Sequence, residues 1–283
     1  IFSGALMLVI AKGVFFNKYN YRVKHVNLAF PNLPKQFENY KVIQISDAHV
    51  GSNDSSHNLH KAIDIINNQK PDIILFTGDM VNMHSNEFKP FVPIFQKLSA
   101  KDGKYSILGN HDYGDYARFD TQHDKIEKLK NLIDYERMAG FTVLLDSNAT
   151  ITRNDESIHI VGVENWGYQP FPQKGNLERA MKGISEGEFS ILLSHDPSHW
   201  DSIASKYTPF IPLTLSGHTH GMQFGFDILG FRWSPVQWKY PLWGGLYKRD
   251  GRKLYVNIGL GFVGMPGRVG MLPEITVITL KRK

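Results

Sequence analysis

The sequence contains no cysteine among its 283 residues. Disulfide bonds, thiolate metal ligands and cysteine nucleophiles are therefore excluded. The absence does not identify the compartment, because a chain without cysteine is compatible with either redox environment.

The chain has no excess of basic charge outside its N-terminal region. Residues 1–41 contain six lysines and arginines against one acid, Glu38, and the remaining 242 residues balance 26 basic against 26 acidic side chains. The net charge of +5 is therefore local. A nucleic-acid groove needs a basic stripe, so this balance argues against a nuclease, and we expect no nucleic-acid partner.

The apolar segment at the start is too short to span a membrane. Residues 1–11 carry no charge, but a bilayer-spanning helix needs roughly 20 residues. Because the chain begins with isoleucine, we interpret this segment as the end of a transmembrane helix whose start is missing; an ordinary buried helix is the alternative. The basic cluster from Lys12 to Lys24 then favours a cytoplasmic-facing domain with its neck near anionic lipid headgroups. We predict a partial membrane anchor and basic neck at 1–38, and one large domain at 39–283.

The remaining sequence repeats one pattern, in which an apolar run ends in Asp, His or Asn. It occurs five times, as Val42–Ile45 before Ser46–His49, Ile73–Phe76 before Thr77–Asp79, Tyr105–Leu108 before Gly109–Asp112, Ile191–Leu193 before Ser194–Asp196, and Leu213–Leu215 before Ser216–His220. Such runs read as buried strands that release polar residues on a turn. Open α/β sheets place their ligand sites at this edge, so we predict one polar site there.

Strands and helices alternate from residue 40 onward, which predicts a layered α/β sandwich of sheets rather than a barrel. The late strands are expected to be antiparallel. We predict strands at 41–46, 71–76, 104–108, 141–145, 149–153, 157–163, 189–193, 212–216, 253–258 and 274–280, and helices at 57–69, 87–100, 120–139, 176–185 and 199–205.

The polar residues at the strand ends form a set of metal ligands without sulfur. They are Asp47, His49, Asp79, Asn110, His195, His218 and His220. Divalent ions such as Mn²⁺, Fe²⁺ and Zn²⁺ accept carboxylate, imidazole and amide ligands. Seven ligands are too many for one tetrahedral ion, but they suit two divalent metal ions that share a carboxylate and activate a water between them as a hydroxide nucleophile.

The order of these motifs resembles the calcineurin-like metallophosphoesterase superfamily over residues 39–283. The motifs are Asp47-x-His49, Gly78-Asp79, Gly109-Asn110-His111-Asp112, His195 and Gly217-His218-Thr219-His220. The resemblance implies an α/β/β/α sandwich of mixed sheets and a metal-dependent phosphoric ester hydrolase. The segment after His220 and the Gly-rich tail look like a bacterial membrane-associated branch, although many relatives have glycine at the position of Met222.

The resemblance also implies a role for each residue. Asp47, His49 and His220 would bind the first metal, Asn110, His195 and His218 the second, and Asp79 would bridge them. His111 would be a catalytic residue that stabilises or protonates the leaving oxygen. Asp112 would orient this turn or His111.

Two further features admit alternatives. Arg268 lies in a Gly-rich loop, where it would bind a substrate phosphate through its guanidinium or form a surface salt bridge. The segment 221–273 is rich in aromatic residues, which form either an apolar lip for an acyl chain or membrane interface, or a loop packed on itself. These residues are Phe224, Phe226, Phe231, Trp233, Trp238, Tyr240, Trp243 and Tyr247.

Partners of the metal-binding histidines are harder to assign. We consider Asn82 at the site edge, and the carboxylates of Asp54, Asp115, Glu164 and Asp196, with solvent-facing or capping roles as the alternative.

The sequence thus predicts a membrane-associated hydrolase that acts on a phosphate-ester substrate, including lipid-linked or nucleotide-linked lipid substrates. Monoesters, diesters and pyrophosphates remain alternatives, because one metal core serves all three. A membrane protein that binds a phosphate ligand or lipid through an inactive metal site is the alternative from another class. A protein phosphatase is a further rival. The sequence gives no oligomeric state.

Overall fold

The computed structural model describes residues 2–53, 56–228 and 231–283, and only the backbone of residues 2, 3, 5 and 6. Its helices are α1 (Phe2–Phe15), α2 (Ser56–Asn68), α3 (Val92–Phe95), α4 (Gln122–Met138), α5 (Leu177–Ala180) and α6 (Pro197–Ser202). Its strands are β1 (Arg22–Phe30), β2 (Lys41–Ile45), β3 (Ile73–Phe76), β4 (Lys104–Ser106), β5 (Phe141–Val143), β6 (Ser147–Arg153), β7 (Glu156–Gly162), β8 (Ser190–Leu193), β9 (Leu213–Ser216), β10 (Phe226–Ile228), β11 (Phe231–Trp233), β12 (Gly245–Arg249), β13 (Arg252–Val256) and β14 (Glu274–Arg282).

Two mixed six-stranded sheets contain most of these strands. The first has the order β1-β14-β2-β3-β4-β5, and the second has the order β12-β13-β9-β8-β7-β6. Strands β2 to β5 run parallel, as do β7, β8, β9 and β13. Within each parallel set the carboxyl ends of the strands therefore lie at the same edge, as the strand-end pattern predicts.

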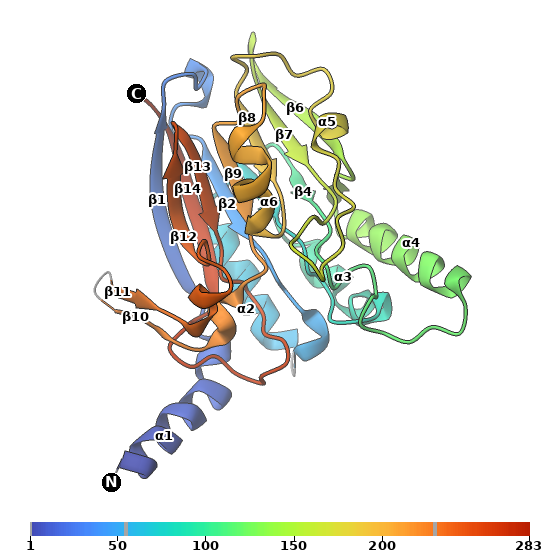
Figure 1. Cartoon of the computed structure of the whole chain (residues 1–283), viewed down its shortest axis with the longest axis vertical. Coiled ribbons are helices and arrows are strands. Elements are labelled where there is room, and N and C mark those ends of the chain that lie inside the picture. The colour runs from blue at the N-terminus through green and yellow to red at the C-terminus, as the bar shows by residue number, and fades with distance from the viewer. Residues whose placement is uncertain (1, 54–55, 229–230) are drawn as a thin grey trace.

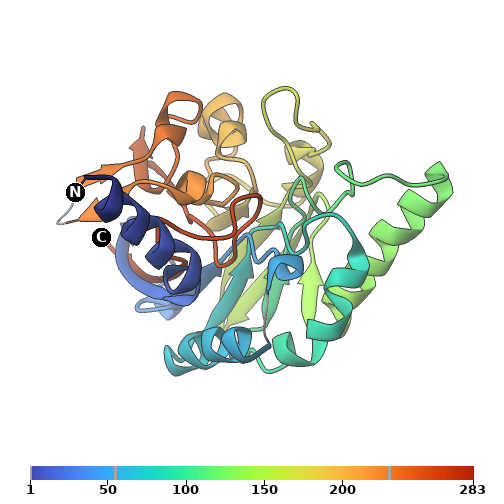
Figure 2. The ribbon, with the colours of Figure 1, turned by 90° about the horizontal axis from the view of Figure 1, so that it is seen from below.

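The two sheets pack face to face, with helices on both outer faces (Figure 1). One hydrophobic cluster joins the sheets and includes Ile73 and Leu75 from the first and Ile191 and Leu213 from the second. Separate clusters cover the outer faces, one with α2, α3 and α4 and one with α5 and α6. Figure 2 shows the helices on opposite sides of the sheets. The predicted α/β/β/α sandwich of mixed sheets is confirmed.

Some predicted elements are shorter than expected, for local reasons. The helix predicted at 87–100 is reduced to short 3₁₀ turns and the single turn α3, because Pro90 and Pro93 cannot continue a helix. The helix predicted at 176–185 stops at Ala180, shortly before Gly183, whose φ of +85° is left-handed. The structure also contains β10, β11 and β12, which the periodicity does not indicate.

The late strands are only partly antiparallel. Strand β14 runs antiparallel to β2, as expected, but parallel to β1. Strand β13 likewise runs parallel to β9 and antiparallel to β12.

Strand β1, which lies within the predicted neck, is part of the first sheet. Strand β1 pairs with β14 at the edge of the first sheet, and Phe30 and Phe37 are buried between the sheets. The boundary predicted at residue 38 therefore does not coincide with a break in packing. Within the described ranges, no helix has the length and apolar character that crossing a membrane requires.

Candidate metal centre

Both sheets deliver predicted ligands to one place. Asp47 and His49 follow β2, Asp79 follows β3, and Asn110 follows β4. His195 follows β8 in the second sheet, and His218 and His220 follow β9. All of these side chains are buried except that of His218, which is nearly so.

Three of the ligands form one group. Nε2 of His220 lies 3.2 Å from Oδ1 of Asp47 and 3.1 Å from Nε2 of His49. Their ligand atoms all lie within 4.8 Å of one another, close enough to hold one metal ion.

A second group surrounds the amide oxygen of Asn110. Nε2 of His195 lies 3.1 Å from this oxygen, and Nδ1 of His218 lies 2.8 Å from it. The ligand atoms of Asp79, His195 and His218 also all lie within 4.8 Å of one another.

Asp79 lies between the two groups. Its Oδ2 is 3.6 Å from Nε2 of His49 in the first group and 3.2 Å from Nε2 of His195 in the second. This is the residue for which the resemblance implies a carboxylate shared by two ions.

Strained backbone conformations aim several of these side chains. The φ angles of Asp47, Asp79 and His218 are +51°, +61° and +74°, and His49 and His220 are also left-handed. Such conformations cost of order 1–3 kcal/mol each and persist where the surrounding structure enforces them. Gly109 has no room for a side chain, because an added Cβ would lie 2.2 Å from Oδ1 of Asp79.

In three of the four histidines, an oxygen atom of another residue lies next to the ring nitrogen that faces away from the ligand group. Nδ1 of His49 is 3.0 Å from Oδ1 of Asn82, and Nδ1 of His195 is 2.7 Å from the carbonyl of Thr77. Nε2 of His218 is 2.8 Å from the hydroxyl of Tyr240. These contacts fix the ring orientation and leave the other nitrogen facing the ligand group.

The electrostatics of the site favour ionised carboxylates beside a neutral His49. Burial alone would raise the pKa of Asp47, but His220 holds that pKa below its usual range. Burial likewise opposes ionisation of Asp79, and nearby His195 and His111 hold its pKa far below normal. Burial lowers the pKa of His49 to about 3, which leaves its imidazole neutral.

His111 differs from the four histidines above. Its amide donates to Oδ1 of Asp79 at 2.9 Å, and its Nδ1 lies 2.7 Å from the carbonyl of Asn82. Its ring centroid is 4.4 Å from that of Tyr116. A ring nitrogen of His111 also lies within 4.8 Å of ligand atoms of His49 and Asp79. The structure thus brings this predicted catalytic residue to the centre.

Asp112 braces the turns that carry the ligands. Its carboxylate accepts backbone N–H groups from Gly109 and Asp79 at 2.8 Å each, from Met80 at 2.9 Å and from Val81 at 3.3 Å. Burial raises its pKa to about 7, and the neighbouring Asp79 adds to this. Both oxygens of Asp112 contact backbone, which is the geometry expected of a residue that orients this turn.

Arg268 does not lie where a substrate phosphate would reach it. Its side chain is fully buried, and its guanidinium donates to backbone carbonyls of Ile258, Gly259, Gly261 and Met271. This buried position fits neither a phosphate contact at the surface nor a surface salt bridge. Its Nη2 instead lies 3.2 Å from Nδ1 of His220. Burial lowers its pKa to about 10, so the group is still a cation at neutral pH.

Of the other predicted partners of the metal-binding histidines, two lie next to a histidine and two have other partners. Asn82 contacts His49, and Oδ2 of Asp196 is 3.5 Å from Nε2 of His218. Asp115 instead pairs with Lys125, and Glu164 accepts from the hydroxyl of Tyr113. Asp54 lies outside the described residues.

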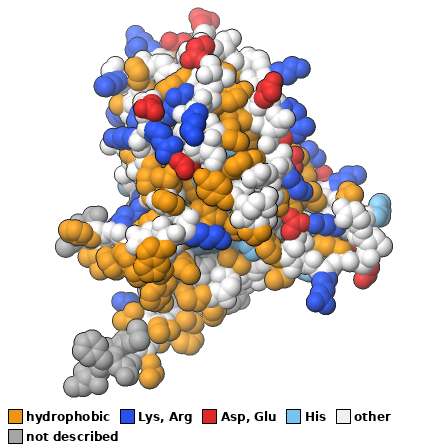
Figure 3. Space-filling view, viewed as in Figure 1, with side chains coloured by type: hydrophobic (Ala, Val, Ile, Leu, Met, Phe, Trp, Pro, Cys, Tyr) orange, Lys and Arg blue, Asp and Glu red, His pale blue; other side chains and the backbone are white. Residues whose placement is uncertain are grey.

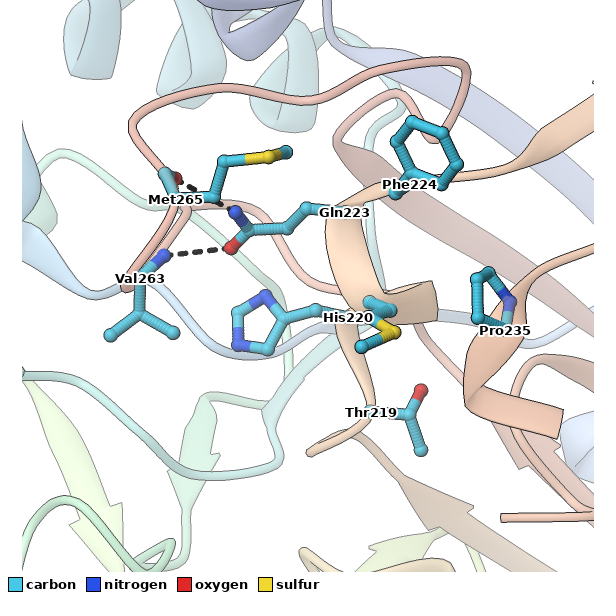
Figure 4. A pocket seen from close by; sticks show the side chains of 8 residues that line it. Thr219, His220, Gln223, Phe224, Pro235, Val263 and Met265 are labelled. Atoms are coloured by element: carbon cyan, nitrogen blue, oxygen red, sulfur yellow. Dashed lines mark hydrogen bonds between the residues drawn. The ribbon is translucent and has the colours of Figure 1, made fainter. Parts of the chain in front are cut away.

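The aromatic segment is partly an exposed apolar surface and partly a loop packed on itself. Trp238 and Phe231 are 78% and 77% exposed, whereas Tyr240 and Trp243 are buried. A pocket of about 500 Å³ lies beside His220. It is lined by Thr219, His220, Met222, Gln223, Phe224, Pro235, Val263 and Met265 (Figure 4).

Sequence reasoning missed two tyrosines that contact ligands. The hydroxyl of Tyr240 contacts His218, and that of Tyr116 accepts from Nδ2 of Asn110 at 2.8 Å. Tyr116 lies six residues beyond its partner in an irregular segment, where spacing carries no signal. Tyr240 was considered only as part of the aromatic segment.

The arrangement fits divalent metal ions. Buried nitrogen and carboxylate atoms lie close together, as in the 3.1 Å approach of the two Nε2 atoms of His49 and His220. Two imidazole nitrogens at this distance are well placed for a shared cation, and the mixed oxygen and nitrogen set suits Mn²⁺, Fe²⁺ or Zn²⁺.

Comparison with known proteins agrees with this chemistry. Residues 40–222 match the family model described as "Calcineurin-like phosphoesterase". The chain is 35% identical over 253 residues to "Uncharacterized metallophosphoesterase YkuE" of Bacillus subtilis, covering 88% of this chain and 82% of that protein. It is 28% identical over 273 residues to an uncharacterized metallophosphoesterase of Aquifex aeolicus, covering 94% of each.

A third relative is the Danio rerio "Transmembrane protein with metallophosphoesterase domain". The identity is 26% over 269 residues, covering 92% of this chain but only 57% of that protein. The family match spans most of the ligand motifs, and the similarity to the Bacillus protein extends over most of both chains. The chain belongs to the calcineurin-like phosphoesterase family and is a metal-dependent phosphoric ester hydrolase.

Proposed function

We propose that the protein hydrolyses phosphate esters with two divalent metal ions, in the manner of a phosphodiesterase or pyrophosphatase. The observation that carries this proposal is the position of Asp79, whose Oδ2 lies within 3.6 Å of a histidine from each ligand group. Asp47, His49 and His220 would hold one ion, and Asn110, His195 and His218 would hold the other.

When bound, such a pair of ions neutralises phosphate charge and supplies an activated water as nucleophile. The residues of this chain contribute orientation. Asp112 ties the turn after β3 to the turn after β4, which fixes Asp79 relative to Asn110. Ring contacts with backbone and side-chain oxygens hold three of the histidines in place.

His111 is suited to assist the leaving group. Its Nδ1 is occupied by the carbonyl of Asn82, so Nε2 is the nitrogen left for the substrate. A proton held on Nε2 would stabilise the negative charge that develops on the leaving oxygen and then pass to it.

Membrane association is the second part of the proposal. Along α1, Leu8 and Phe15 are 73% and 71% exposed, and the hairpin β10–β11 exposes Phe231. Figure 3 shows hydrophobic side chains gathered over the hairpin and α1 at one end of the molecule. We propose that this end rests on a membrane surface, with the domain facing the cytoplasm, and that the substrate is lipid-linked. The pocket beside His220 lies within the 300–1,000 Å³ usual for ligand sites.

Two cations of the predicted basic neck are paired with an acid of the same chain, and not left free for lipid headgroups. Asp227 on β10 forms ion pairs with Lys24 at 2.7 Å and with Arg22 at 3.2 Å. These two cations therefore hold the hairpin against β1. Apolar contact, more than basic charge, is the basis of the proposed association.

Metal removal and restoration test the enzymatic proposal directly. The protein stripped by a chelator should lose hydrolysis of a generic phosphodiester, and Mn²⁺ should restore it. A UDP-linked diacyl sugar in detergent, assayed in parallel, would separate a lipid-nucleotide hydrolase from a broad phosphodiesterase. Activity that persists in the stripped protein would contradict the proposal, and intact metal binding without turnover of any ester would favour the inactive alternative.

A further inference from the structure

The end of α1 lies against the loop that carries Arg268. The amide of Arg268 donates to the carbonyl of Gly13 at 3.1 Å. A Cβ added at Gly13 would lie 2.6 Å from Cγ2 of Val269, and one added at Gly267 would lie 2.7 Å from Cα of Val14. Since side chains do not approach so closely, this backbone contact depends on a glycine in each segment.

The same loop is held on its other side by Gln223. Nε2 of Gln223 donates to the carbonyls of Met265 and Gly267 at 2.8 and 3.0 Å, and its Oε1 accepts from the amide of Val263 at 2.7 Å. Figure 4 shows this side chain reaching from the turn of His220 toward the loop. The loop 263–269 is therefore clamped between α1 and the 3₁₀ turn His220–Gln223.

Arg268 connects this clamped loop to a metal ligand. Its guanidinium donates to the carbonyls of Ile258 and Gly261, and the same Nη2 lies 3.2 Å from Nδ1 of His220. Arginine only donates, and Nδ1 of a histidine bound to an ion through Nε2 also carries a proton, so the guanidinium packs beside the ring and its hydrogen bonds go to the carbonyls. The segment that it holds donates in turn from Leu260 and Gly261 to the carbonyls of Ser46 and Asp47, at 2.8 Å each.

We infer that α1 is part of the support of the metal centre. By seating the loop 263–269, it fixes Arg268, and Arg268 holds the segment 258–261 against Asp47 and His220. Arg268 is then a positioning residue for the ion held by Asp47, His49 and His220. The inference rests on the proposed two-metal function, and it assigns α1 a role beyond contact with a membrane.

The geometry makes this effect selective. His220 belongs to the first group, whereas the second group is supported by Thr77 and Tyr240, which come from other segments. Displacing the loop should therefore weaken the binding of the ion in the first group and leave the binding of the other ion unchanged. A merely structural role would lower the stability of the whole protein without distinguishing the two ions.

Two glycines of the same helix provide a matched test. Gly13→Ala would push against Val269, whereas no described atom lies within 4 Å of a Cβ added at Gly4. Both changes raise helix propensity by a similar amount. Calorimetric titration of the metal-stripped full chain with Mn²⁺ should show one binding step weakened about 10-fold in Gly13→Ala, as for other residues that support ligands. Gly4→Ala should match the wild type in both steps.

Arg268→Lys gives an independent reading, because lysine keeps the positive charge but cannot reproduce the planar fork. The same step should weaken. Equal binding by Gly13→Ala and Gly4→Ala would overturn the inference, as would equal weakening of both steps in Gly13→Ala. A wild-type protein that binds fewer than two Mn²⁺ ions would instead overturn the proposed function.

Discussion

At the residue scale, His111 and the metal ligands share a site but differ in what holds them. His111 is anchored through its amide to Asp79 and through Nδ1 to the carbonyl of Asn82. Neither contact uses Nε2. The residue can therefore act on a substrate while its backbone helps to orient the carboxylate between the two groups.

Substitution of His111 tests this division of labour. His111→Ala should lower kcat by roughly 10²–10⁴-fold, because general acid assistance is worth about that much. Mn²⁺ binding should change little, since the metal ligands stay in place. The control is His123→Ala, which alters an exposed histidine on α4. A kcat within a few-fold of the wild type in the His111 variant would contradict the assignment.

The residue scale also shows what a sequence can reveal about a site. Ligands such as Asp79 and Asn110 are readable because each follows a strand at a glycine turn. The roles of Arg268 and Tyr240 cannot be read from the sequence, because they depend on contacts between segments that are distant in the chain. Arg268 and His220, for example, are 48 residues apart. A sequence reveals a charge in a glycine-rich loop, but it does not reveal that carbonyls surround it.

At the element scale, α4 is joined to the first sheet by a buried acid. Glu136 is fully buried, and the hydroxyl of Ser106 at the end of β4 donates to it. Burial raises the pKa of Glu136 well above its usual value, and Asp112 adds to this. The folded protein therefore keeps a proton that the unfolded chain releases above about pH 4.5.

This proton makes stability depend on pH with a definite sign. Stability should fall as pH rises from about 4.5 toward the pKa of the folded state, by up to about 1.4 kcal/mol per pH unit from this group. Glu136→Gln should therefore lose less stability than the wild type between pH 5 and 8 in thermal unfolding. Glu127→Gln, an exposed position of the same helix, is the control. Parallel stability curves for the Glu136 variant and the wild type would contradict this account.

The hairpin β10–β11 and the turn after it expose the side chains proposed to contact membrane. Replacing Phe231 and Trp238 together by serine should weaken binding to anionic vesicles at least tenfold, because burial of each large side chain contributes about 1.5–3 kcal/mol. Replacing the exposed Ile126 and Met138 of α4 by serine is the matched control. Equal vesicle binding by the two double variants, measured by co-sedimentation, would contradict a role for the hairpin.

Prediction of elements succeeded where the pattern is local. The strands that feed the site and the long helices α2 and α4 have clear periodicity, and each lies within a few residues of its predicted bounds. The hairpin and β12 were missed because glycine and aromatic residues mask their alternation. The position of β1 beside β14 depends on pairing across almost the whole chain, which no local pattern encodes.

At the scale of the whole molecule, the site exists because two sheets meet. The first sheet supplies both carboxylates and the amide, and the second supplies three of the four histidines. Each of the two proposed ion sites draws its ligands from both sheets. Loss of packing between the sheets should therefore remove metal binding and activity together.

We propose that one chain binds two ions bridged by Asp79. The most direct measurement is the number of Mn²⁺ ions bound per chain at saturation, determined by native mass spectrometry for the wild type and for Asp79→Asn. The account predicts two ions for the wild type, and fewer than two for Asp79→Asn at the same Mn²⁺ concentration. A fully active wild-type protein that saturates at one ion would contradict it.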